Sequence, residues 1–105
     1  MAAADGAYVA LLLVHLHFPD VGSLKAKRKD LASVKAQLHG RMGVTVAEVA
    51  HQDLWQRATL AAALTGGSIN HVESATDRVE QFLLERFPES VRVERTVRSF
   101  DEVWH

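Results

Sequence analysis

The stretch "VTVAEVAHQDLWQRATLAAAL", residues 44–64, decides the fold because it holds two strand-like segments with no helix between them. Residues 44–49 and 55–64 are short and apolar, which is typical of strands, and Gly66 and Gly67 end the second segment. The connection gathers many polar and aromatic side chains, namely His51, Gln52, Asp53, Trp55, Gln56 and Arg57. This stretch predicts two consecutive strands joined by a polar cluster.

On its N-terminal side, the pattern predicts a strand followed by a helix. The apolar run of residues 7–18 stops at Pro19 and suits a strand buried on both faces. Ser23 is a good N-cap, and we predict a helix from Leu24 to His39 that Gly40 and Gly43 stop. The positions that recur at helical spacing are Leu24, Arg28, Leu31, Val34 and Leu38.

On its C-terminal side, the pattern predicts a second helix and a last strand. Ser68 caps this helix, and Pro88 lies beyond its end. One helix face carries Ile69, Val72, Val79, Phe82, Leu83 and Phe87. Residues 91–100, "VRVERTVRSF", alternate as a strand does.

The resulting order of elements predicts a ferredoxin-like βαββαβ sandwich of the α+β class. It has a four-stranded antiparallel sheet with both helices on one face. We expect one domain over residues 1–105, with about 1–6 and 102–105 flexible. In this topology, the ends of the strands that carry His15, His17 and His51 share one edge with the start of the first helix. Trp55 and Arg57 fall on the same edge.

Composition limits the classes of protein to consider. The chain has 105 residues, of which 48% are hydrophobic, and it has no cysteine. It therefore forms one core without disulfides or thiolate metal sites. The apolar run of residues 7–14 is shorter than the roughly 20 residues of a membrane helix, and the N-terminus lacks the basic residues of a signal peptide. We expect a cytoplasmic protein without a membrane partner.

The net charge of −1 hides an uneven distribution. Residues 23–41 hold six basic residues and one acidic residue, a net charge of +5. Residues 66–89 hold five acidic residues and two arginines, a net charge of −3. The partner is therefore expected on the basic side.

Two segments carry a resemblance to a known family. Residues 14–38, with the motif "SLKAKR", and residues 46–64, with the motif "HQDLWQRA", resemble the YlxP-like family of small bacterial proteins. The resemblance implies a ferredoxin-like domain with no established biochemical activity, often encoded beside genes for transcription and ribosome maturation. Where it implies an acidic residue before the motif's histidine, this chain has Ala50, which leaves His51 without a carboxylate on its preceding side.

The start of the first helix is the main candidate site. Its cations are Lys25, Lys27, Arg28 and Lys29. They stand where the positive end of the helix dipole disfavours cations, and a bound phosphate would reverse that effect. This predicts a non-enzymatic module that binds RNA or a ribosomal particle and needs no cofactor. The alternatives are a solvated basic face and a protein-interaction factor with an acidic partner.

The polar cluster adds an aromatic side chain to this site. Trp55 can stack on a base while Arg57 contacts phosphate. In the alternative interpretation, Asp53 shapes the turn by accepting backbone hydrogen bonds, and Trp55 buries its ring. Gln52 belongs to the same turn.

The histidines allow two further chemistries. His15 and His17 lie two apart on a strand and point to the same face, a spacing that can chelate a metal, but no third ligand is evident. We therefore predict no metal site. His51 and Asp53 could act as base and orienter in a small hydrolase, a weaker alternative because no serine nucleophile or glycine-rich elbow accompanies them.

The sheet face away from the helices predicts a second interface. Strand parity places Leu11, Leu13 and Ala61 on this face, whereas an RNA-recognition motif needs aromatic residues there. An apolar face of this kind suits burial against a second copy of the chain, so we expect a homodimer.

Overall fold

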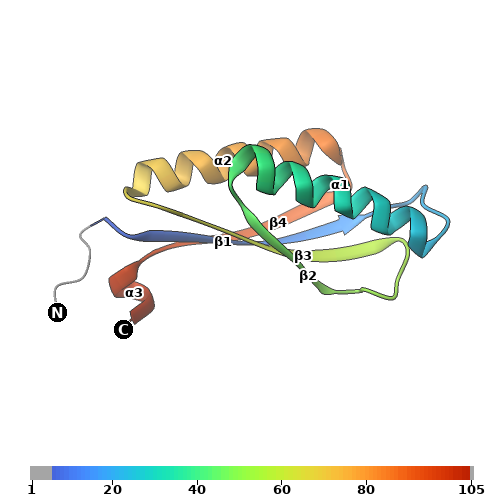
Figure 1. Ribbon diagram of the computed structural model, residues 1–105, viewed down its shortest axis with the longest axis horizontal. Helices are drawn as coiled ribbons and strands as arrows, with labels where there is room; N and C mark the ends of the chain where they lie inside the picture. The colour runs from blue at the N-terminus through green and yellow to red at the C-terminus, as the bar shows by residue number, and fades with distance from the viewer. Residues whose placement is uncertain (1–5, 105) are drawn as a thin grey trace.

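The computed structural model describes residues 6–104 and confirms the ferredoxin-like α+β fold. Its four-stranded antiparallel sheet has the order β2-β3-β1-β4, with α1 and α2 on one face and the short α3 on the other (Figure 1). The elements are β1 (Tyr8–His17), α1 (Leu24–Met42), β2 (Thr45–Ala50), β3 (Arg57–Gly66), α2 (Ile69–Arg86), β4 (Val91–Ser99) and α3 (Phe100–Trp104).

The core lies between the sheet and the two long helices. Alternate residues of β1 and β3, among them Leu12 and Leu60, are fully buried against α1 and α2. The intervening residues of β1 point to the other face, where Leu11 is 47% exposed. The expectation that this strand is buried on both faces is therefore wrong, because α1 and α2 lie on the same side of the sheet (Figure 1).

The first helix begins where predicted but ends three residues later. The Ser23 hydroxyl oxygen accepts a hydrogen bond from the Ala26 N–H at 3.1 Å and caps its start. Gly40 lies inside the helix, so it does not stop the helix as predicted. The end falls at Gly43, which has a φ of 66° and donates its N–H to the His39 carbonyl at 3.1 Å. This left-handed conformation is the one that glycine adopts readily after a helix.

The C-terminus forms a helix that was not predicted. The Ser99 hydroxyl accepts from the Glu102 N–H at 3.2 Å, and the Glu102 carboxylate accepts from the Ser99 N–H at 2.9 Å. This reciprocal capping box lowers the pKa of the Glu102 carboxyl, chiefly through the bond from the Ser99 backbone. The strand consequently ends at Ser99 rather than at Phe100.

The expected flexibility of residues 1–6 and 102–105 falls partly outside the described residues, since these exclude 1–5 and 105. Residues 102–104 belong to α3. No helix formed by residues 6–104 is both long and apolar enough to cross a bilayer.

Candidate nucleic-acid interface

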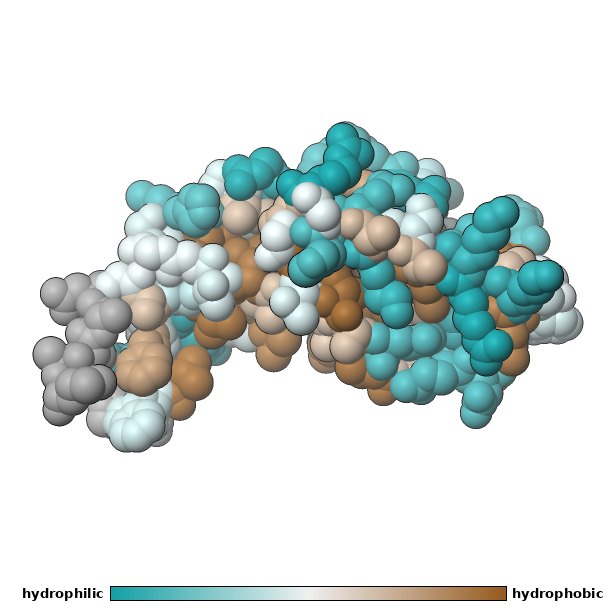
Figure 2. All heavy atoms as spheres, viewed as in Figure 1, coloured by the Kyte–Doolittle hydropathy of each residue, from teal (hydrophilic) through white to brown (hydrophobic). Residues whose placement is uncertain are grey.

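One end of the elongated molecule combines the start of α1, the β2–β3 connection and the start of β3 (Figure 1). Hydrophilic side chains gather at this end, on the right in Figure 2. Its exposed cations and aromatic residue, together called the basic end, are Lys25, Arg28, Lys29, Trp55 and Arg57. The first turn of α1 holds no acidic residue, so nothing within that turn offsets the helix dipole.

Lys27 does not belong to this surface, although it was predicted to contact nucleic acid. Its side chain is 1% exposed, and its Nζ donates hydrogen bonds to the carbonyls of His51 and Leu54, both at 2.6 Å. Glu48 Oε2 lies 3.1 Å from the same Nζ. Among residues 6–104 this oxygen has no hydrogen-bond partner of suitable geometry, so its contact with Lys27 is an ion pair. A buried ammonium requires such partners, and their presence allows the side chain of Lys27 to be buried.

Lys27 thereby fixes the connection that presents Trp55. The His51 carbonyl also accepts the Leu54 N–H at 3.1 Å, which closes a turn in which His51 has a φ of 64°. Gln52 donates to the Glu48 carbonyl at 3.4 Å, and Asp53 is exposed. The turn is therefore held by its own backbone and by the ammonium of Lys27.

Trp55 is 49% exposed, so the alternative in which its ring is buried is wrong. Trp55 also precedes the strand instead of starting it, because β3 begins at Arg57. Arg57 lies opposite His17 in the register of β1 and β3 and is exposed. The structure brings Trp55 and Arg57 together at the edge where the sequence placed them.

The cations of the basic end lack acidic partners. Among residues 6–104, no carboxylate oxygen comes within salt-bridge distance of any of them. By contrast, Arg95 on β4 pairs with Asp77 and Glu80 of α2, at 2.7 and 3.2 Å. Unpaired cations at the start of a helix are free to meet phosphate oxygens, as are the unpaired N–H groups of its first turn.

The side chain of His15 contacts residues of the two strands beside β1. Its Nε2 lies 2.7 Å from Glu94 Oε2 on β4, and its Nδ1 lies 3.5 Å from the Thr59 hydroxyl on β3. The hydrogen bond with His15 is the main cause that lowers the pKa of the Glu94 carboxyl, and Arg92 adds to it from 3.6 Å. This cluster lies on the sheet face away from the long helices.

Two other chemistries gain no support from the geometry. The part of the chain that the structure describes contains no group of three or more His, Asp or Glu side chains able to hold a metal. Within residues 6–104, no hydrogen bond joins the side chains of His51 and Asp53, which the hydrolase hypothesis pairs. His51 contributes its carbonyl to the turn.

Sequence reasoning missed Glu48 and Glu94 as partners of the site. Position 27 precedes Leu31, Val34 and Leu38 at helical spacing, so the stripe that enters the core includes Lys27. Glu48 and Val46 both face the helices, which placed an acid opposite that lysine. Glu94 had no comparable signal, because the pairing of β4 with β1 depends on the register.

Fold and site together define a ferredoxin-like α+β domain with an exposed basic end. The chain belongs to the family described as "Protein of unknown function (DUF503)", which it matches over residues 9–96. It is 35% identical over 78 residues to "Uncharacterized protein YlxP" of Bacillus subtilis (strain 168), an alignment that covers 74% of this chain and 80% of that protein. The resemblance to the YlxP-like family is thus confirmed.

A solved structure shares the architecture. The "De novo designed protein Foldit4" matches with a TM-score of 0.58 and 9% identity, over 89% of this chain and 97% of the designed chain. At this level of identity the likeness concerns the fold alone.

Proposed function

We propose that this protein is a non-enzymatic, cytoplasmic module that binds RNA, free or within a ribosomal particle, through its basic end. The observation that carries the proposal is the set of exposed cations at the start of α1 that have no acidic partner among residues 6–104. Each phosphate that these cations neutralise releases a counterion, which supplies affinity without reading the sequence of the RNA.

The exposed indole of Trp55 favours RNA over an acidic protein as the partner. A carboxylate-rich surface needs only the cations, whereas a single-stranded RNA also offers bases that stack on an aromatic ring. The middle of the sheet presents Leu13 and Ala61 instead of aromatic residues, which disfavours base stacking across the sheet as in an RNA-recognition motif. We therefore expect the bases of a single-stranded RNA to stack on Trp55 at the basic end.

Removing charge from the basic end should flatten the salt dependence of RNA binding. We expect the variant Lys25→Gln/Lys29→Gln to lose about 1.4 units of the log-log slope of affinity against salt, if each cation neutralises one phosphate of a single strand. Fluorescence anisotropy with a labelled oligouridylate, measured over a salt series, gives this slope.

A matched control removes equal charge elsewhere. Arg41 and Arg78 are exposed, Arg41 in the last turn of α1 and Arg78 on α2, so Arg41→Gln/Arg78→Gln should keep nearly the original slope. Equal slopes for the two double variants would contradict a localised RNA site. Binding to an acidic polypeptide but to no RNA would instead identify a protein partner.

A further inference from the structure

The sheet face opposite α1 and α2 carries apolar side chains that residues 6–104 leave uncovered. Leu11 is 47% exposed and Leu13 is 38% exposed on β1, and in the register Leu13 lies opposite Ala61 of β3. We call this surface the open face: Val9, Leu11, Leu13, Ala47, Ala61 and Ala63. Its residues are small or branched, which suits close packing against another sheet.

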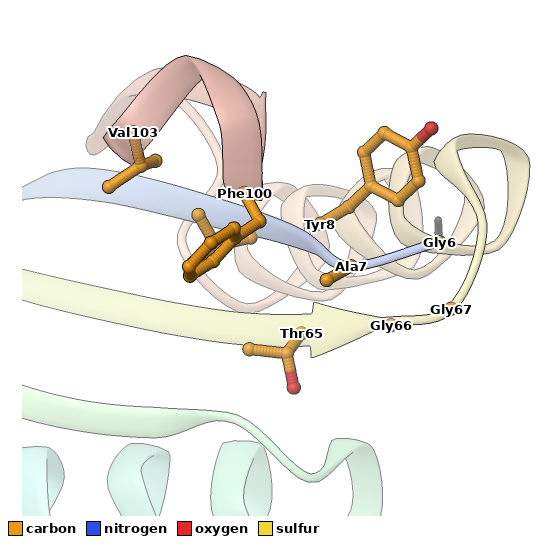
Figure 3. A pocket seen from close by; sticks show the side chains of 9 residues that line it. Gly6, Ala7, Tyr8, Thr65, Gly66, Gly67, Phe100 and Val103 are labelled. Atoms are coloured by element: carbon orange, nitrogen blue, oxygen red, sulfur yellow. The ribbon is translucent and has the colours of Figure 1, made fainter. Parts of the chain in front are cut away.

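The short helix α3 extends the open face at the end away from the basic end (Figure 1). Phe100, Val103 and Trp104 are all exposed, Trp104 to 72%. Phe100 and Val103 project from α3 beside a pocket of about 430 Å³, which is also lined by Val9 and Thr65 (Figure 3). The apolar surface is thus continuous from the middle of the sheet to α3.

The polar residues of this side lie toward the margins. On β4, Arg92, Glu94 and Arg98 pair in register with His15, Leu13 and Val9 of β1. His17 and Arg57 pair where β1 ends and β3 begins, which is the end of the sheet next to the basic end. An apolar centre within a polar margin is the usual anatomy of a protein–protein interface.

The chain exposes more surface than a compact monomer of its mass. Its total is 6720 Å², whereas a compact monomer of 11.6 kDa exposes roughly 5,800 Å². The excess of about 900 Å² is of the same order as the roughly 800 Å² that each partner buries in a standard interface. The molecule measures 52 × 24 × 22 Å, and its sheet has long helices on one face only, so the open face is available for such burial.

We propose that the open face binds a second copy of this chain, with the two sheets packed face to face. The net charge of −1 leaves little repulsion between copies, and the six residues that define the open face are all apolar. Burying an apolar face of this size against an identical face gives a closed, two-fold assembly. The open face contains no residue of the basic end, so the test of the dimer is independent of the test of RNA binding.

Two matched substitutions test this dimer. Leu13→Lys places an ammonium on the open face opposite Glu94, and Leu84→Lys places one on α2, one helical turn after Glu80. Both leucines are exposed to a similar degree, 38% and 44%, and each new lysine has a carboxylate beside it. The two variants therefore carry the same charge and a similar local environment, on opposite faces of the protein.

Sedimentation equilibrium and light scattering at about 100 μM measure the outcome. We expect twice 11.6 kDa for the unmodified chain and for Leu84→Lys, and 11.6 kDa for Leu13→Lys. Val103→Lys, on exposed α3, provides a second variant that does not touch the core and should also weaken the dimer. A monomeric unmodified chain would overturn the proposal. A dimer that persists in both Leu13→Lys and Val103→Lys would do so as well, because it would place the interface elsewhere.

Discussion

Replacing Lys27 with Met is expected to lower the free energy of unfolding by about 3–5 kcal/mol, the usual effect of removing one partner of a buried ion pair. The change keeps the length of the side chain and removes the ammonium that contacts Glu48 and the carbonyls of His51 and Leu54. The two carbonyls then lose this donor, and the part-buried Glu48 carboxylate loses its counter-charge. Urea unfolding followed by circular dichroism measures the difference.

The control for this experiment stands two residues earlier. Lys25 is exposed and has no acidic partner among residues 6–104, so Lys25→Met should change stability by no more than about 0.5 kcal/mol. The double variant Lys27→Met/Glu48→Gln should recover part of the loss, because it removes the unpaired carboxylate. Equal stabilities of Lys25→Met and Lys27→Met would show that the contacts of Lys27 contribute nothing.

Replacing Trp55 with Ala is expected to weaken RNA binding by about 1–3 kcal/mol, roughly 5- to 150-fold, if the indole stacks on a base. The salt slope should stay the same because no charge is removed. Because Trp55 is about half exposed, the substitution should leave the fold intact. Anisotropy titrations at several salt concentrations separate the two quantities.

The second tryptophan of the chain allows the fluorescence of Trp55 to be measured alone. Trp104, its only other tryptophan, lies on α3 at the far end of the molecule. Trp104→Phe leaves Trp55 as the only indole, and RNA should then quench its fluorescence. If RNA leaves the fluorescence of Trp55 unchanged and Trp55→Ala binds RNA with full affinity, then RNA contacts only the cations of the basic end.

The overall fold was predictable because burial follows apolar periodicity. Leu31, Val34 and Leu38 recur at helical spacing, and alternate residues of β1 and β3 enter one core, so the order of elements left few topologies. The short α3 was missed although "SFDE" is a capping-box pattern, because the alternation of β4 continues as far as Phe100.

The convergence of the candidate site residues at one end was predictable, and the contacts of each residue were predictable only in part. Exposed cations and Trp55 converge on one end because the topology brings those segments together. Lys27 was misplaced because a lysine is ordinarily exposed, and its burial depends on Glu48 and two carbonyls from a distant segment. The partner of His15 depended on the register between β1 and β4, which local patterns do not fix.

The basic end and the open face occupy different parts of a molecule that is 52 Å long. A dimer joined through the open face therefore carries two basic ends, both left accessible. An RNA long enough to reach both gains from effective concentration, since its second attachment is intramolecular. Short oligonucleotides would then bind the dimer and the Leu13→Lys monomer equally, whereas long ones would prefer the dimer. If both proposals hold, the protein would distinguish RNA molecules by their length and not by their sequence.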